Sequence, residues 1–237
     1  MAGKAGFLYE AKIQNIFKKN KIAPAGFRPA GSDPDAPDAM FIYKGKPYKL
    51  EIKLDKTVDF GQGSLDYDLK KDKWMLGGQK TPAAEQMREF LTTMGVPRLV
   101  NSNKGWGGLG PPRKFTVPLK QYKKEDVDYD YKHFTDRFIP IPNYNAVAKY
   151  YNTKQTYYIQ IGGFGLFHMG KDPARIGTTE FKPQLRVRVR LKRGGSNPIY
   201  NYRFSTAIQA TKINKSVVDL DDKEFMQAFA ARAKAKR

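Results

Sequence analysis

The stretch PDAMFIYKGKPYKLEIKL, residues 37–54, decides the fold of this chain. It holds two strand-like runs, 39–43 and 48–54, on either side of the turn-forming sequence KGKP. We therefore predict an antiparallel hairpin. Asp38 stands at the head of its first strand, and Glu51 and Lys53 lie two residues apart on the second.

The predicted register brings the charged residues to one face of the hairpin. With a turn at Gly45-Lys46, Asp38 faces Lys53, and residues two apart on a strand share a face. Two carboxylates and a lysine on one face are costly for stability alone, because the acids repel each other and the lysine must shed water. A divalent cation would resolve this. Asp38 and Glu51 offer hard oxygen ligands, and the main-chain carbonyl of Ile52 offers another.

This set of residues predicts phosphodiester hydrolysis. A bound metal lowers the pKa of its water and neutralises charge on the phosphate under attack. Lys53 would hold or activate that water and stabilise the developing charge. Asp33 and Asp35 compete with Asp38 for the metal, since Pro34-Asp35 repeats the dipeptide. We prefer Asp38 because it lies nearer the strand.

The surroundings of the hairpin predict an α/β protein. Apolar spacing predicts a helix over 3–20, and Thr81-Pro82 opens a second one that runs to Met94. The other expected elements are loops at 30–38, 59–68 and 101–113, loop with short elements at 121–153, strands at 157–161, 165–169, 185–192 and 200–207, and a helix from about Asp221. We expect a catalytic core over 1–100 and a basic β-rich portion over 101–237, packed as one unit.

Composition points to a polyanionic partner. The 237 residues hold 43 Lys and Arg against 23 Asp and Glu, a net charge of +20, and nucleic acid is the first candidate. The absence of cysteine excludes disulfides, zinc fingers and thiol nucleophiles. The N-terminus carries charges where a signal peptide would be apolar, and no apolar run approaches the ~20 residues of a membrane span. We expect a soluble, cytoplasmic protein without a membrane partner.

Two basic segments are candidates for contact with nucleic acid. The strand 185–192 places Arg186, Arg188, Arg190 and Lys192 on one face. Four cations without an interleaved acid repel one another, which favours a phosphate-binding face over an ordinary solvated one. The loop with Lys104, Trp106 and Arg113 would enter a groove or stack on a base, or else be a mobile loop. The C-terminal RAKAKR is an electrostatic arm or a frayed helix end.

The order Pro37-Asp38, then Glu51-Ile52-Lys53, resembles the signature of the PD-(D/E)XK nuclease superfamily. The resemblance covers roughly residues 7–95. It implies a restriction-endonuclease-like mixed central sheet flanked by helices, and a deoxyribonuclease that uses Mg²⁺, with Mn²⁺ as a substitute. It also implies a third acid from the first helix, where Glu10 stands; the alternative for Glu10 is a solvated helix residue. A homodimer acting as an endonuclease on duplex DNA is the family's expectation.

Three functions remain open at this point. A sequence-specific restriction-type enzyme is preferred, because about 140 residues beyond the core leave room for base readout. A structure-selective nuclease such as a Holliday-junction resolvase fits the same residues. In the third alternative the chain is a nucleic-acid-binding protein without catalytic activity, and Asp38 and Glu51 have no catalytic role.

Overall fold

The computed structural model describes residues 2–27, 36–193 and 201–235, without the side chains of residues 2 and 3. Its elements are α1 (Ala2–Lys19), β1 (Ala39–Tyr43), β2 (Lys46–Lys53), β3 (Asp59–Asp68), β4 (Lys73–Leu76), α2 (Pro82–Thr93), α3 (Val96–Val100), α4 (Arg113–Thr116), η1 (Leu119–Gln121), α5 (Lys124–His133), β5 (Arg137–Ile141), α6 (Asn145–Thr153), β6 (Thr156–Ile161), β7 (Gly165–His168), β8 (Thr179–Glu180), β9 (Gln184–Arg193), β10 (Tyr202–Lys212) and α7 (Lys223–Lys234).

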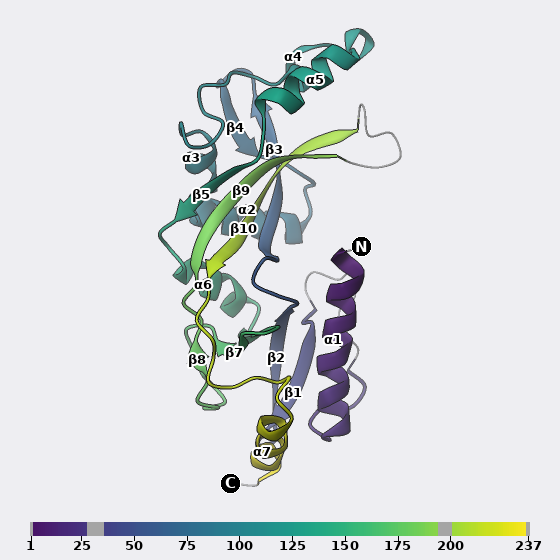
Figure 1. The fold of residues 1–237 in the computed structure, drawn as a ribbon, viewed down its shortest axis with the longest axis vertical. Helices are drawn as coiled ribbons and strands as arrows, with labels where there is room; N and C mark the ends of the chain where they lie inside the picture. Colours follow the sequence, from purple (N-terminus) through teal and green to yellow (C-terminus); the bar gives the residue numbers. More distant parts are fainter. Residues whose placement is uncertain (1, 28–35, 194–200, 236–237) are drawn as a thin grey trace. The chain divides into compact units, whose positions relative to one another are not determined.

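The chain divides into two compact units (Figure 1). Unit 1 comprises residues 1–58, 144–184 and 210–237, and unit 2 comprises residues 59–143 and 185–209. This differs from the expected division at residue 100. The reason is a long-range pairing: β2 pairs in parallel with β6, so the first sheet is completed by residues from the second half of the chain. Such pairings leave no local trace in a sequence.

Unit 1 is built on a mixed sheet with the strand order β1-β2-β6-β7-β8. The pairs β1–β2 and β6–β7 are antiparallel, whereas β2–β6 and β7–β8 are parallel. Helix α1 runs alongside β1 (Figure 1), α6 contacts β6 and α7 contacts β1. The predicted α/β class, with a mixed sheet and flanking helices, is confirmed.

The hairpin β1–β2 exists, but its register differs from the predicted one. Ala39 pairs with Leu50 and Tyr43 with Lys46, so the turn is Lys44-Gly45 rather than Gly45-Lys46. Both turn residues have positive φ, +48° and +77°. A two-residue turn of this kind matches the twist of the flanking strands. The difference amounts to two positions along the strand, so each side chain keeps its predicted face.

The packing of the hydrophobic core of unit 1 determines which face of the sheet the side chains of Glu51 and Lys53 occupy. Leu50 and Ile52 of β2 are buried in the hydrophobic core, together with Phe41 of β1 and Phe17 of α1. Because side chains alternate along a strand, Glu51 and Lys53 point to the opposite face of the sheet. Burial of the apolar face therefore positions the charged one.

Unit 2 holds a second sheet with the order β4-β3-β10-β9-β5. The pairs β3–β4, β3–β10 and β5–β9 are antiparallel. Helix α2 packs on β3. An aromatic cluster of Trp74, Trp106, Phe134 and Phe204 forms the interior, with ring centroids of Trp74 and Trp106 4.9 Å apart. The β-rich portion that the sequence predicts is divided between the two sheets: β9 and β10 lie here with β3, β4 and β5, whereas β6 and β7 belong to the sheet of unit 1.

Two segments expected to be largely loop are regular structure. Residues 59–68 form the strand β3, and 121–153 contain α5, β5 and α6. The glycines that suggested a loop at 59–68 are there for packing. A Cβ added at Gly61 would lie 2.7 Å from a ring carbon of Phe90, and one at Gly63 would lie 2.7 Å from a methyl carbon of Leu91. Glycine lets α2 approach the strand closely.

The remaining predicted helices and strands are close to their observed positions. The first helix, the helix capped by Thr81 and the strands near 157–161, 165–169 and 185–192 are confirmed within a few residues. The last helix begins one residue later than expected, since Asp222 rather than Asp221 accepts the hydrogen bond from the N–H of Phe225. In the described part of the chain, no helix is long and apolar enough to cross a bilayer.

Candidate active site

The head of the hairpin is held by Asp38. Its Oδ2 accepts a hydrogen bond from the backbone N–H of Ile52 at 2.8 Å. The N–H and C=O of one strand residue point to the same edge of that strand. The Ile52 carbonyl therefore also points toward the side on which Asp38 lies, where β1 has not yet begun.

Glu51 is held by two neighbours. Its Oε1 lies 2.5 Å from Nζ of Lys53 and accepts a hydrogen bond from the hydroxyl of Tyr151 at 3.0 Å. The side chains of Lys53 and Glu51 are 19% and 15% exposed. Tyr151 lies on α6 and is buried. The carboxylate is thus fixed from its own strand and from a helix 100 residues away in the chain.

The charged residues interact through the low-dielectric interior. Burial, followed by the charge of Glu51, raises the pKa of Asp38 to about 7, although Lys53 opposes the shift. Burial also raises the pKa of Glu10 on α1, with Lys53 lowering it and Glu51 raising it. Burial lowers the pKa of Lys53, but Glu51 and Asp38 outweigh that effect, so its pKa is raised and the ammonium stays charged. The structure therefore brings all four predicted residues into one electrostatic group.

The donor set fits a hard divalent cation. The carboxylates of Glu10, Asp38 and Glu51 have one nearby lysine, Lys53, to balance their negative charge. A carboxylate shielded from water at neutral pH is stabilised by a cation or takes up a proton. Among the described residues no three His, Asp or Glu side chains gather closely enough to hold a metal by themselves. A metal here would be held by Asp38, Glu51, the Ile52 carbonyl and water. Mg²⁺ is commonly bound by one or two carboxylates with several waters retained.

The predicted basic face of β9 exists, but it is less repulsive than the sequence suggested. Val187 and Val189 are buried, and the alternate cations are half-buried, as the alternation predicts. Neighbouring segments supply partners that the sequence of the strand does not contain. Arg188 pairs with Asp136 at 2.6 Å, Arg190 lies 3.9 Å from Asp59, and Arg186 donates to Gln209 at 3.3 and 3.2 Å. Binding of phosphate by this face, Lys192 included, stays a prediction.

The assignment of Trp106 to base stacking is wrong. Trp106 is 1% exposed, packs in the aromatic core of unit 2, and donates its indole N–H to the carbonyl of Thr135 at 3.0 Å. Lys104 is exposed in the turn after α3. Arg113 is exposed at the start of α4, its guanidinium 4.8 Å from the ring centre of Tyr129. Asp33, Asp35 and the last two residues of the C-terminal tail lie outside the described residues.

Tyr151 is a residue of the candidate site that the sequence did not predict. Tyr151 contacts Glu51, and burial, with the charge of Glu51, raises its pKa well above its usual range, so the hydroxyl stays protonated and donates. It lies in a Tyr-rich segment without clear periodicity. The only local signal is the helical spacing of the buried residues Ala146, Val147 and Tyr151 in α6.

Comparisons with known proteins add little. No protein-family model and no curated protein sequence matches this chain. A solved structure described as HhaI endonuclease in complex with DNA matches 96% of this chain and 98% of its own, with 13% sequence identity and a TM-score of 0.37. A TM-score this low carries no argument about fold or function. The function of this chain has to follow from its own side chains.

Proposed function

We propose that this chain is a Mg²⁺-dependent endonuclease that hydrolyses phosphodiester bonds of duplex DNA, with a restriction-endonuclease-like unit 1. The observation that carries the proposal is the convergence of Asp38, Glu51 and Lys53 on one half-buried face at the head of the hairpin, with Glu10 of α1 near enough to interact electrostatically with them. A metal-binding set of oxygens beside a lysine is what this hydrolysis requires. Four half-buried ionisable groups at one end of a sheet are costly for stability, and a bound cation would offset that cost.

The residues have separate roles in this proposal. Asp38, Glu51 and the Ile52 carbonyl would hold Mg²⁺, or Mn²⁺ in its place, and the metal supplies a water of lowered pKa. Lys53, whose ammonium lies 2.5 Å from Glu51 at the same site, would hold the water and stabilise the negative charge that develops on the phosphate. Tyr151 keeps Glu51 in place, and Glu10 adds negative charge that strengthens cation binding.

The charge of the chain supports a DNA substrate. A net charge of +20 favours a polyanion. The half-buried arginines of β9 in unit 2 offer a face for the phosphate backbone, which would give affinity and position rather than sequence choice. Preference for duplex substrate and a homodimer are carried over from the superfamily resemblance, and the cytoplasmic location rests on the charged N-terminus.

The test is a cleavage assay on supercoiled plasmid, linear duplex, four-way junction and single-stranded DNA, with Mg²⁺ or with EDTA. We expect duplex cleavage with Mg²⁺ only. Glu51→Gln keeps the shape of the side chain and should abolish cleavage while DNA binding in EDTA is retained. Glu224→Gln, which changes an exposed acid on α7, is the matched control and should cleave normally.

Two results would overturn the proposal. One is the absence of Mg²⁺-dependent cleavage on every substrate, which would leave a non-catalytic nucleic-acid-binding protein. The other is cleavage by Glu51→Gln at the rate of the unaltered protein, which would place the chemistry elsewhere. Strong preference for the four-way junction would replace the restriction-type assignment with a junction resolvase.

A further inference from the structure

The outer face of the sheet in unit 2 carries an exposed aromatic ring among its arginines. Val187 of β9 points inward and is buried, so Arg186 and Arg188 on either side of it point outward. Phe138 of β5 lies directly opposite Arg188 and therefore shares the outer face. Its side chain is 49% exposed. The sequence predicted the cations of this face but not the ring between them.

Two guanidinium groups hold the ring of Phe138 in place. The Cζ atom of Arg186 lies over the ring, 4.2 Å from its centre, and that of Arg188 lies 5.8 Å from it. A guanidinium is attracted to the negatively charged face of an aromatic ring. Phe138, Arg186 and Arg188 therefore form one surface cluster, here called the aromatic platform, and part of its ring remains open to solvent.

The two arginines of the platform are themselves fixed by neighbours. Nε and Nη2 of Arg186 donate to the side-chain oxygen of Gln209 at 3.3 and 3.2 Å, and Gln209 donates to Asp59 at 2.9 Å. Nε and Nη2 of Arg188 donate to one oxygen of Asp136 at 3.1 and 2.6 Å. Side chains that are ordered before binding lose less conformational freedom when a ligand arrives. The arrangement therefore favours binding at this position.

The chemistry of the platform determines which ligand fits it. The face of a phenyl ring carries partial negative charge, so a phosphate by itself is not attracted to it. A second copy of the chain is disfavoured as well, because a symmetric pair would bring the same arginines face to face. A nucleobase is flat and stacks on aromatic rings, and the phosphates of its strand are attracted to arginine. A base within a nucleic acid therefore matches both the ring and the cations.

We propose that Phe138 stacks on a base of the bound DNA, while Arg186 and Arg188 contact the phosphates beside that base. Neighbouring bases cover the base faces in an intact duplex. The ring therefore reaches a base that is unpaired, or it separates two adjacent base pairs as an apolar wedge. This inference rests on the DNA substrate of the proposed function, but it does not depend on the chemistry at Asp38.

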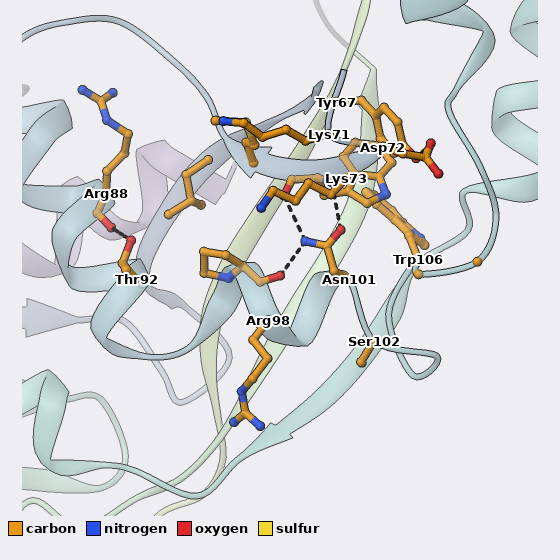
Figure 2. A pocket seen from close by; sticks show the side chains of 16 residues that line it. Tyr67, Lys71, Asp72, Lys73, Arg88, Thr92, Arg98, Asn101, Ser102 and Trp106 are labelled. Carbon is orange, nitrogen blue, oxygen red and sulfur yellow. Dashed lines mark hydrogen bonds between the residues drawn. The ribbon is translucent and has the colours of Figure 1, made fainter. Parts of the chain in front are cut away.

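A pocket elsewhere in unit 2 is separate from the platform (Figure 2). Its volume is about 930 Å³, and among the described residues none of β5 or β9 lines it. The side chain of Asn101 accepts from the N–H of Trp74 at 2.8 Å and donates to its carbonyl at 2.9 Å (Figure 2). Trp74 and Trp106, the two tryptophans of the chain, are 2% and 1% exposed. An indole introduced at the platform would therefore be the exposed one.

The proposal is tested by the affinity of the full-length protein for DNA in EDTA. The probes are a single-stranded oligothymidine, an abasic strand of the same length, and a duplex with or without one unpaired thymidine. We expect the oligothymidine to bind about tenfold more tightly than the abasic strand, since stacking of one base on an aromatic side chain has an effect of this order. Tighter binding of the duplex with the unpaired thymidine would identify an unpaired base as the ligand. Equal binding of the two duplexes, weakened by loss of the ring, would identify a wedge between base pairs.

Three variants separate stacking from general effects. Phe138→Leu keeps an apolar side chain but removes the ring, and it should bind the two single strands equally. Phe138→Trp should keep the preference for oligothymidine, and its added fluorescence should fall when oligothymidine binds but not when the abasic strand binds. Leu119→Ala removes another exposed apolar side chain of unit 2, 87% exposed, and should keep the tenfold preference.

Three results would overturn the inference and leave the nuclease proposal standing, because no cleavage is measured. These are equal affinity of the unaltered protein for the two single strands, an unchanged preference in Phe138→Leu, and an unchanged fluorescence of Phe138→Trp with oligothymidine. A fourth result, the absence of binding to any of these DNAs, would overturn the inference together with the DNA substrate on which it rests.

Discussion

Replacement of Asp38 by asparagine tests whether the candidate site holds more negative charge than the metal-free protein tolerates. Burial and the charge of Glu51 raise the pKa of Asp38 from 3.8 to about 7. At 1.36 kcal/mol for each pKa unit, the ionised carboxylate costs the folded state roughly 4 kcal/mol. Asp38 keeps partial contact with solvent. We therefore expect a measured effect of about 1–2 kcal/mol.

The sign of the effect depends on pH. The folded pKa of Asp38 lies above its unfolded pKa, so the stability that the protonated side chain contributes is complete below pH 4 and is lost as the pH rises through about 7. Asparagine removes the charge, and its oxygen still accepts from the N–H of Ile52. At pH 8 in EDTA, Asp38→Asn should melt roughly 2–8 °C above the unaltered protein. At pH 4 the two should melt together.

Scanning calorimetry at both pH values measures this difference. Glu224→Gln controls for loss of a carboxylate from an exposed position of the same unit, and it should not reproduce the pH-dependent gain. An Asp38→Asn protein that melts at or below the unaltered protein at pH 8 would refute the reasoning. So would a gain of equal size at pH 4 and pH 8, because only a carboxylate ionised in the folded state makes the gain depend on pH.

Three further predictions follow from the same structure. Because Mg²⁺ must displace a proton from Asp38, the affinity for Mg²⁺ measured by calorimetry should fall about tenfold for each pH unit below about 7 and level off above it. An affinity that does not change between pH 5 and pH 8 would contradict this. Tyr151→Phe removes the 3.0 Å hydrogen bond to Glu51 and should lower the Mg²⁺-dependent cleavage rate about tenfold, while the circular dichroism spectrum stays unchanged. An unchanged cleavage rate would show that Tyr151 does not position Glu51. Gly61→Ala should destabilise unit 2 by about 1–3 kcal/mol, because its Cβ would meet the ring of Phe90 at 2.7 Å; an unchanged midpoint of urea unfolding, followed by tryptophan fluorescence, would show that α2 can move away.

The catalytic candidates were readable from the sequence because they lie on one hairpin. The side chains of Asp38, Glu51 and Lys53 share a face by strand alternation, and that result survives the two-position difference in register. The predicted turn was one residue off, but the strand pairing then differs by two positions, and an even shift leaves each side chain on its predicted face of the sheet. Local periodicity also predicted most of the helices, since their apolar stripes and caps lie within a few turns of chain.

Other features depend on residues far apart in the chain. Tyr151 reaches Glu51 only because β6, which follows α6, pairs in parallel with β2. Trp106 resembled an exposed loop residue because glycines and prolines surround it, yet it closes the aromatic core against Trp74. Asp136 and Asp59 neutralise arginines of β9 from other strands or loops.

The amino-acid sequence by itself determined the charge of the protein, the hairpin and the face on which its acids and lysine stand. These properties depend on composition and on the two-residue period of a strand, which a linear chain displays directly. The tertiary structure alone decided the division into two units, the partner of Glu51 and the pocket beside Trp74. Each of these arises where segments many residues apart pack together, and the free energy of that packing belongs to the assembled fold rather than to any one segment.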